Sequence, residues 1–361
     1  MIARSLEMLT ETEFVSKKKP PREYVIVAMP GDGIGPEQFK ATKLVIDKVV
    51  SVLKIPIRIR IVEAGDSAYY KYGKALPDDA LKAVYSSHAC LKGPMGERAA
   101  DVIVRLRQDL DLFVNLRPAK TYPNIKTPIK KKLDLVIVRE NTEGLYKGFE
   151  WMLTNEVAAA LRVISYSASI RIAKFAFNLA RIRRKKVTIV HKANVLRKTC
   201  GLFVRASKEV AKSFPDVRVE EQYIDACAAN LIRKPESFDV ILTTNLFGDI
   251  LSDEVAQLAG SLGLGPCGNI GFDYAIFEPV HGAAFDIAGK GIANPISMIL
   301  SACMMFEWLG MRYSDERCMM AGRLIEEATE SVLSEGKKLT PDLGGSCTTL
   351  EVAEEITGRI G

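Results

Sequence analysis

The stretch YVIVAMPGDGIGPEQFKATKLVIDKVVSVL (residues 24–53) joins a short apolar run to a longer segment in which apolar residues recur at helical spacing. The run YVIVAM (24–29) has the length and composition of a buried strand. The apolar side chains of the second segment fall roughly on one helical face, at Phe39, Leu44, Val45, Val49 and Leu53. We therefore expect a strand, a glycine-containing turn and a helix, in that order.

The same alternation recurs further along the chain. Its apolar runs are LDLVIVRE (133–140), KVTIVH (186–191) and FDVILTTN (238–245), each followed by a helix-compatible stretch. Strands that alternate with helices are typical of a parallel sheet covered by helices. The predicted fold class is α/β, with mostly parallel sheets flanked by helices.

Composition excludes several classes of protein. The 361 residues are 48% hydrophobic and 26% charged, which is ordinary globular usage and allows two or three lobes. The net charge is +6, from 50 Lys and Arg against 44 Asp and Glu, and this is too small to imply nucleic acid or a membrane as a partner. The sequence has no run of about 18 apolar residues, so a membrane-spanning helix is excluded, whereas a small anionic substrate fits.

Cysteine and histidine usage limits the compartment and the metal chemistry. Seven scattered cysteines without CxxC spacing favour a reducing cytoplasm over a disulfide framework or a zinc site. The three histidines lie far apart in sequence, so any metal must use oxygen ligands. Residues 1–23 lack the apolar core of a signal peptide, and we expect a mobile or loosely docked N-terminal extension.

Two carboxylates in NLFGDILSDE are spaced for metal binding. Asp249 and Asp253 are four residues apart, so a helix would place both on one face, where their like charges repel. A Mg²⁺ or Mn²⁺ ion between them would explain that cost, but a helix N-terminus with Asp249 as its cap is an equally good interpretation. Asp225 stands in the mostly apolar stretch QYIDACAANL, where a buried acid needs a partner, and is our candidate for a third ligand.

Other polar residues stand at the ends of expected elements. Arg107, Arg117 and Arg139 could bind carboxylates through bidentate guanidinium groups, although surface arginines are the ordinary alternative for any one of them. Because Pro118 should end its segment, Arg117 is expected at a strand tip. Tyr146 and Lys192 could each act as a general acid or base, or could be plain polar residues at strand ends.

The glycine-rich stretch PGDGIGPE (30–37) is not a standard phosphate loop. It has neither the third glycine of the dinucleotide motif nor the Lys-Ser/Thr pair of a P-loop. A structural turn between strand and helix is the favoured interpretation.

Together these motifs resemble a family, the metal-dependent β-decarboxylating dehydrogenases that include 3-isopropylmalate, isocitrate and homoisocitrate dehydrogenases. The resemblance runs through GDGIGPE, LKGPMGE, LRQDLDLFVNLRPAK, VRENTEGLYKG, VHKANV, NLFGDILSDE, GNIG, EPVHGAAFDIAGKGIANP and DLGG. The segment around LKGPMGE is most similar to archaeal 3-isopropylmalate dehydrogenases. Only the N-terminal extension lies outside the resemblance.

The resemblance implies a two-domain, isopropylmalate dehydrogenase-like fold that is not a Rossmann fold. A first, nucleotide-binding domain would combine residues 24–112 with 265–361, and residues 113–264 would form a second domain that makes the dimer. Each active site would lie between domains and borrow residues from the partner subunit. The protein would therefore be a homodimer with shared sites, or a tetramer built from such dimers.

The resemblance also assigns roles to the candidate residues. Arg107, Arg117 and Arg139 would clamp the substrate carboxylates, with Asn194 also at the substrate. Asp225, Asp249 and Asp253 would bind Mg²⁺ or Mn²⁺. Lys192 would take the hydroxyl proton, and Tyr146 would help to protonate C3 after decarboxylation.

The cofactor loop implied by the resemblance is EPVHGAAFDIAGKGIANP. Its cofactor-binding residues would be Glu278, His281, Gly282, Ala283, Asp286, Ile287 and Asn294. Asp286 would accept hydrogen bonds from the adenosine ribose and repel a 2′-phosphate, and Ile287 replaces the tyrosine of NADP-dependent relatives. The expected cofactor is NAD.

The substrate choice rests on GERAADVIVRLRQ. Ile103 and Val104 precede Arg107 by four and three residues, so on a helix they would stand beside the substrate substituent. Their apolar side chains favour the isopropyl group of 3-isopropylmalate, converted to 4-methyl-2-oxopentanoate in leucine biosynthesis. Asp101 must then have an ion partner or point outward, and capping of the helix is its ordinary structural role. The alternatives are isocitrate or homoisocitrate as substrate, or an inactive regulatory subunit, which the complete set of catalytic residues disfavours.

Overall fold

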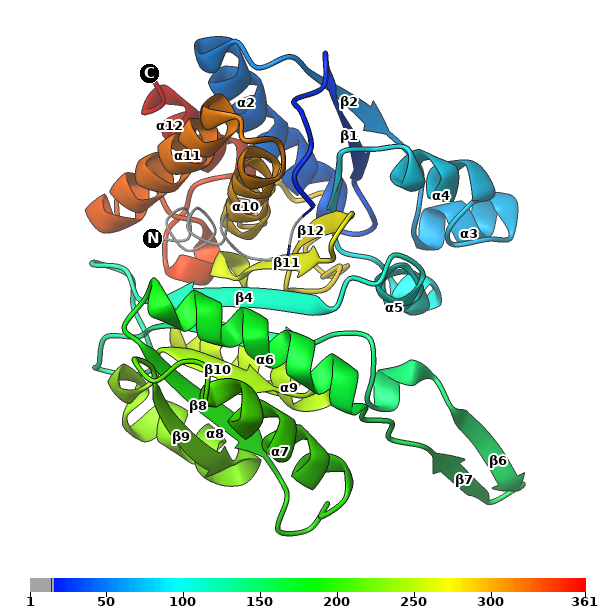
Figure 1. Ribbon diagram of the computed structural model, residues 1–361. Helices are drawn as coiled ribbons and strands as arrows, with labels where there is room; N and C mark the ends of the chain where they lie inside the picture. Colours follow the sequence, from blue (N-terminus) through cyan, green and yellow to red (C-terminus); the bar gives the residue numbers. More distant parts are fainter. Residues whose placement is uncertain (1–13, 15) are drawn as a thin grey trace.

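The computed structural model describes residue 14 and residues 16–361, which form one ten-stranded sheet flanked by helices and a separate two-stranded arm (Figure 1). The order across the sheet is β2 (Ile57–Ile61), β1 (Tyr24–Met29), β3 (Ala89–Lys92), β12 (Ala275–Pro279), β11 (Pro266–Ile270), β4 (Val114–Lys120), β5 (Asp134–Glu140), β10 (Val240–Thr243), β8 (Lys186–His191) and β9 (Arg218–Tyr223). Neighbouring strands are parallel except in the middle, where β12, β11, β4 and β5 pair antiparallel. The predicted α/β class is confirmed, and the antiparallel centre distinguishes the sheet from a Rossmann fold.

The helices divide into two groups along this sheet. Around the first five strands lie α2 (Gly35–Leu53), α3 (Asp66–Tyr72), α4 (Asp78–Tyr85), α5 (Ala100–Asp109), α10 (Ile296–Tyr313), α11 (Glu316–Glu335) and α12 (Thr349–Gly358). Around the other five lie α6 (Tyr166–Arg181), α7 (Thr199–Ala211), α8 (Ile224–Arg233) and α9 (Asn245–Leu258). The first five strands come from residues 24–112 and 265–361, and the other five from residues 113–264. The division into domains at these boundaries stays a prediction.

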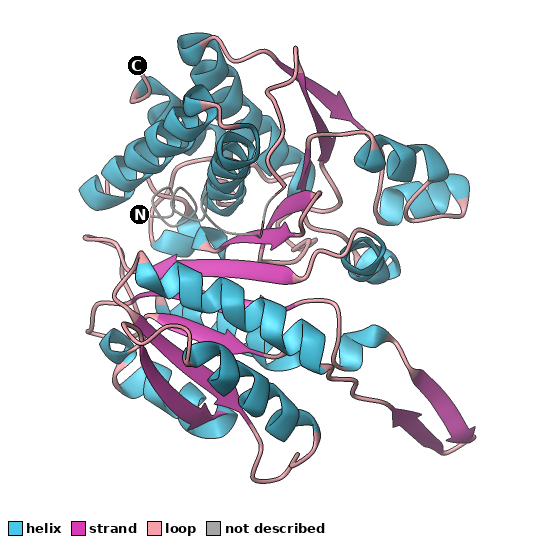
Figure 2. Cartoon of the chain, viewed as in Figure 1, coloured by secondary structure: helices cyan, strands magenta, loops and turns pink. Residues whose placement is uncertain are grey.

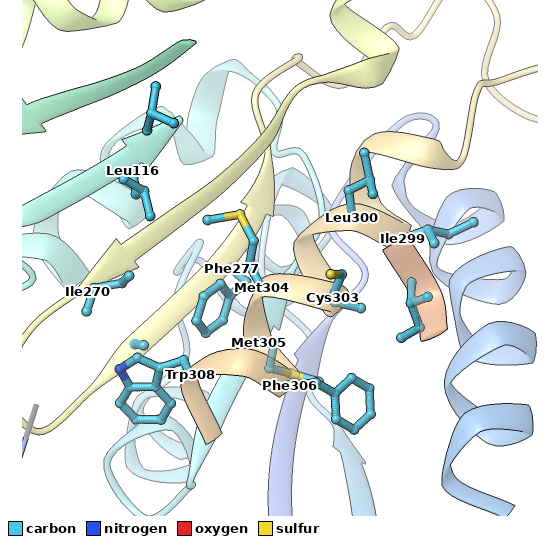
Figure 3. Close-up of a cluster of buried hydrophobic side chains, with 14 of the residues drawn as sticks. Leu116, Ile270, Phe277, Ile299, Leu300, Cys303, Met304, Met305, Phe306 and Trp308 are labelled. Atoms are coloured by element: carbon cyan, nitrogen blue, oxygen red, sulfur yellow. The ribbon is translucent and has the colours of Figure 1, made fainter. Parts of the chain in front are cut away.

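Helix α10 is the centre of the half of the fold that is built around the first five strands. Every residue of this helix is buried. A helix that is buried on all sides must be covered completely by other elements. Here α11 covers one side and the strands β11 and β12 another. Figure 3 shows Met304 close to Phe277 of β12, and the Phe277 and Trp308 rings lie 6.4 Å apart between centroids. This core fixes the strands that enter the candidate site.

The described part of the N-terminal extension is anchored rather than mobile. Phe14 is buried and meets the ring of Phe175 on α6 edge to face, with centroids 5.5 Å apart. Farther on, the Lys18 amide donates to the Arg312 carbonyl at 2.8 Å. The rest of the expectation for this extension concerns residues 1–13 and 15, which lie outside the described residues.

The arm consists of β6 (Glu150–Thr154) and β7 (Val157–Ala160) and projects away from the main sheet (Figure 2). Every residue of β6 is exposed. Its exposed apolar side chains include Trp151, Met152 and Leu153. A two-stranded sheet has little stability by itself, and the apolar side chains of this arm are open to solvent in the single chain. None of the described helices is long and apolar enough to cross a membrane.

Candidate active site

A cleft with a volume of about 220 Å³ opens between α5, the end of β12, the turn η3 (Leu145–Lys147) and α9. The structure brings many of the predicted site residues to its walls, namely Ile103, Val104, Arg107, Arg117, Tyr146, Asp249, Glu278, His281 and Gly282. These residues come from five separate segments of the chain. The cleft therefore combines cationic groups, carboxylates and an apolar pair.

α9 presents its two carboxylates to the arginines of the neighbouring strands. Arg117 lies 3.3 Å from Asp249 Oδ1 and 3.2 Å from Asp253 Oδ1, measured from its Nη2 and Nη1 atoms. Arg139, buried on β5, also pairs with Asp249 and holds Asn245 Oδ1 through its Nε at 2.9 Å. Because α9 begins at Asn245 after Thr244, Asp249 is not a helix cap. The capping alternative is wrong, and the two acids lie one turn apart on one helix face.

Arg117 does not stand at a strand tip, so that expectation is wrong. β4 continues to Lys120, and Arg117 pairs with Ile137 in the middle of the strand. Pro118 is tolerated because β11 pairs with β4 only as far as Leu116, leaving that edge of the strand without a required N–H donor.

The two acids of α9 differ in their electrostatic surroundings. Burial favours the neutral form of Asp249, but the Arg139 and Arg117 guanidinium groups outweigh it and lower the pKa of that carboxyl. Burial raises the pKa of Asp253, which is farther from Arg139 and nearer to water. Asp249 is therefore ionised at neutral pH, in contact with two guanidinium groups.

Tyr146 completes this part of the cleft. Its hydroxyl donates to Asp249 Oδ2, and the Arg139 guanidinium lies 5.2 Å from the centre of its ring. Burial, followed by the hydrogen bond and the charge of Asp249, raises the pKa of the phenol. Tyr146 thus keeps its proton at neutral pH, as a proton donor must.

The floor of the cleft contains one charged residue that the sequence analysis did not assign, Lys92, beside Arg107 and Glu278, which it did. Lys92 Nζ lies 2.7 Å from Glu278 Oε2, and Arg107 Nη2 lies 3.2 Å from Glu278 Oε1. Asn269 donates to Glu278 Oε1 at 2.8 Å and accepts from Arg107 Nε at 2.9 Å. Lys92 stands in the LKGPMGE motif directly after an apolar run. A polar residue at such a strand end is the sequence feature that could have indicated it as a site residue. Glu278, expected at the cofactor, is committed here to two cations.

The cofactor loop follows β12 and is partly occupied by internal contacts. Ala283 is buried, whereas Asp286 is exposed and Ile287 half-buried. The Asn294 side chain donates to Asp342 Oδ2 at 3.0 Å and accepts from the Ile296 amide at 3.0 Å. Asn294 therefore stabilises the start of α10.

A second group of predicted residues lies outside the cleft of its own chain. Lys192 Nζ is 2.7 Å from Asp225 Oδ1 at the beginning of α8, and Asn194 is exposed on the loop after β8. The Asp225 side chain is 67% exposed, so the expectation that it is a buried acid is wrong. Within the described residues of one chain, no group of three His, Cys, Asp or Glu side chains could hold a metal ion. The three predicted ligands are thus not brought together by a single subunit.

This architecture and cleft agree with the similarity of the chain to known proteins. Residues 25–356 match the family model for isocitrate/isopropylmalate dehydrogenase. The 3-isopropylmalate dehydrogenase of Archaeoglobus fulgidus is 54% identical over 93% of this chain and 99% of its own, and that of Sulfurisphaera tokodaii is 50% identical over 94% and 99%. A crystal structure of isocitrate dehydrogenase from Methylococcus capsulatus superposes with a TM-score of 0.85, at 41% identity, and covers 93% of this chain and 99% of that chain.

The chain belongs to the isocitrate/isopropylmalate dehydrogenase family. It is a β-decarboxylating dehydrogenase, as the sequence motifs predicted. Enzymes of this family act on small anionic substrates and depend in general on a nicotinamide dinucleotide and a divalent metal ion.

Proposed function

We propose that the protein catalyses the NAD- and metal-dependent oxidative decarboxylation of 3-isopropylmalate to 4-methyl-2-oxopentanoate. The observation that carries the proposal is the apolar pair Ile103 and Val104 on the same cleft wall as Arg107. The arginine matches a malate carboxylate, and the pair matches an isopropyl group but not a third carboxylate. The relatives of about 50% identity are named for this substrate.

The acid pair on α9 fits a divalent cation. Asp249 and Asp253 offer hard oxygen atoms on one helix face, and the side chains are 30% and 53% exposed. A third carboxylate, that of Asp225, would come from a second copy of the chain, because it lies outside the cleft of its own chain. A cation held there would supply stabilisation of the negative charge that develops on the substrate during decarboxylation, and a bound NAD would supply the hydride acceptor.

The residues of the chain itself then have distinct tasks. Arg107, Arg117 and Arg139 hold the substrate carboxylates, exchanging their present carboxylate partners for those of the substrate. Lys192 of the second copy takes the proton of the substrate hydroxyl. Tyr146, which keeps its proton at neutral pH, delivers one to C3.

The second copy would complete each site and cover the exposed apolar surface. Besides the arm, the loop and helices near Lys192 expose Val195, Ile232 and Ile250. Large exposed apolar side chains mark an interface between proteins. A homodimer, or a tetramer built from such dimers, would cover these surfaces and bring Lys192 and Asp225 to the acids of α9.

NAD rather than NADP is expected because Asp286 is exposed on the cofactor loop, where it would repel a 2′-phosphate. The seven free thiols, six of them buried, support a reducing, cytoplasmic location.

A turnover assay with the purified protein tests the function. The enzyme is supplied with Mn²⁺, NAD and one substrate at a time: 3-isopropylmalate, isocitrate, homoisocitrate or tartrate. We expect NADH and 4-methyl-2-oxopentanoate from 3-isopropylmalate, with the highest kcat/KM of the four. Equal or better turnover of isocitrate would show that one of the two alternative substrates is the right one.

A further inference from the structure

The glycine-rich loop of residues 30–35 is filled by protein backbone. A Cβ atom built on Gly31 would lie 2.0 Å from the Pro94 carbonyl oxygen, and one on Gly33 would lie 1.9 Å from the Ala283 carbonyl oxygen. Both glycines also have positive φ, +77° and +57°. The loop therefore packs against two other loops, one leading to α5 and one belonging to the cofactor loop, and leaves no room for a phosphate between them.

Asp32 holds the loop that leads to α5 through hydrogen bonds. Its buried carboxylate accepts hydrogen bonds from the amides of Asp66, Ser67 and Gly96, at 2.7, 3.1 and 2.9 Å. Gly96 lies directly before the turn η2 (Glu97–Ala99), which runs into α5. Asp32 thus fixes the start of the helix that carries Ile103, Val104 and Arg107, without reaching the cleft itself.

Glu37 and Gln38, in the first turn of α2, tie the second loop. Glu37 accepts from the amides of Gly291 and Ala293, each at 3.2 Å. Gln38 Nε2 lies 2.7 Å from the Asn294 carbonyl oxygen and 3.0 Å from His281 Nε2. One turn of helix therefore holds both ends of the 281–294 loop.

The same contacts define the protonation of His281. An amide nitrogen only donates, so His281 Nε2 accepts from Gln38, and Nδ1 donates to the Gly282 carbonyl at 3.0 Å. Burial lowers the pKa of this imidazole, which agrees with the neutral form. The ring is fixed in one orientation at the wall of the cleft.

We propose that Asp32 and Glu37 are positioning residues: Asp32 sets the substrate helix α5, and Glu37, with Gln38, sets the dinucleotide loop. Neither side chain lines the cleft. The inference rests on the proposed function for the identity of the two ligands. It assigns the GDGIGPE segment the task of holding the two ligand-binding loops in register, in place of phosphate binding.

Hydrogen exchange of the full-length enzyme tests the contacts without any turnover. In Glu37→Ala we expect faster exchange at Gly291 and Ala293 and unchanged exchange at Ser67 and Gly96. In Asp32→Ala we expect faster exchange at Ser67 and Gly96 and unchanged exchange at Gly291 and Ala293. The isosteric variants Glu37→Gln and Asp32→Asn, which keep one acceptor oxygen, should give intermediate rates and keep the test available where an alanine variant does not fold.

Ligand binding and kinetics test the roles. Because one charge-assisted hydrogen bond contributes about a factor of ten, Glu37→Ala should raise the Kd and KM for NAD about tenfold and leave the KM for 3-isopropylmalate within about twofold. Asp32→Ala should raise the KM for 3-isopropylmalate about tenfold and leave the Kd and KM for NAD within about twofold. The matched control is Asp315→Ala, which removes a buried carboxylate that caps α11 by accepting from the Arg317 amide, lies outside the cleft and should lower Tm alone.

The outcomes separate the two proposals. NAD binding, measured by calorimetry, and exchange need no substrate, so a wild-type enzyme that ignores 3-isopropylmalate would refute the proposed function and leave the positioning roles testable. Variants of Asp32 and Glu37 that change both KM values equally, or that lower only Tm as is expected of Asp315→Ala, would overturn the inference.

Discussion

Lys92 and Glu278 form a buried ion pair in the floor of the cleft, with 2.7 Å between Nζ and Oε2 and both side chains less than a tenth exposed. Burial alone would raise the pKa of Glu278. The Lys92 ammonium and the Arg107 guanidinium outweigh burial and lower the pKa from 4.5 to about 2. The carboxylate therefore stays ionised across the physiological range and neutralises cations that would otherwise repel each other.

Glu278→Gln is expected to destabilise the protein in a pH-dependent manner. A folded-state pKa below the ordinary value stabilises the fold above about pH 4.5, and this stabilisation is lost as the pH falls toward 2; the shift corresponds to roughly 3 kcal/mol. Urea unfolding should show a large difference between wild type and variant at pH 7 that shrinks below pH 4.5. Glu63→Gln, which removes an exposed partner of Lys71, is the control and should have little effect. A difference that stays constant down to pH 3 would contradict the assignment.

If each active site combines residues from two subunits, two inactive variants should regain activity when they form a hybrid dimer. Lys192→Met and Asp249→Asn would damage opposite contributions to each site, so a hybrid dimer retains one intact site. Co-expression with two tags should therefore recover about a quarter of wild-type activity under random pairing. The pairing of Asp249→Asn with Asp253→Asn is the control, because both residues come from the same α9 and every hybrid site lacks one. Recovery in the control, or none in the first pair, would argue against shared sites.

Asp249→Asn should lower kcat by at least about two orders of magnitude, because the cation it helps to hold stabilises charge in the transition state. Asp216→Asn, at an exposed carboxylate paired with Arg181 on the far edge of the fold, serves as the control. In the wild type, EDTA should abolish turnover and Mn²⁺ should restore it. Circular dichroism would verify that both variants fold. Full wild-type activity in EDTA would eliminate the metal site.

The sequence predicted those parts of the fold that depend on local pattern. The run YVIVAM is β1 to the residue, and the predicted helix after it is α2. The antiparallel centre was not predictable, because β11 pairs Asn269 with Asn115, far away in sequence, and its PCGNI has no strand periodicity. In the site, residue types and spacing identified the acids of α9. The Lys92–Glu278 pair spans 186 positions and no local pattern reveals it.

Cofactor preference should change with Asp286→Ala combined with Ile287→Tyr. Removing the exposed carboxylate removes its repulsion of a 2′-phosphate, so the ratio of kcat/KM for NAD to that for NADP should fall by about tenfold or more. Asp79→Ala, at an exposed carboxylate on α4, is the control and should leave the ratio unchanged. The measurement is initial-rate kinetics with each dinucleotide at saturating 3-isopropylmalate. An unchanged ratio in the double variant would mean that another segment determines the preference.

Substrate preference should depend on one wall of α5. Ile103 and Val104 line the cleft beside Arg107, whereas Asp101 is exposed and does not line it, which removes the objection that an acid would adjoin an apolar pocket. Arg105 is also exposed and pairs with Asp109 at 3.1 Å, so it cannot supply a cation to the cleft.

Val104→Arg should therefore lower kcat/KM for 3-isopropylmalate and raise it for isocitrate. A pocket change of this kind alters transition-state binding by about 1–3 kcal/mol, so the ratio of the two kcat/KM values should shift by roughly 10- to 200-fold. Asp101→Asn is the matched control on the same helix and should leave the ratio within about twofold, as a surface change away from the cleft does. If Asp101→Asn shifts the preference and Val104→Arg does not, α5 presents a different face to the substrate than the one that lines the cleft here.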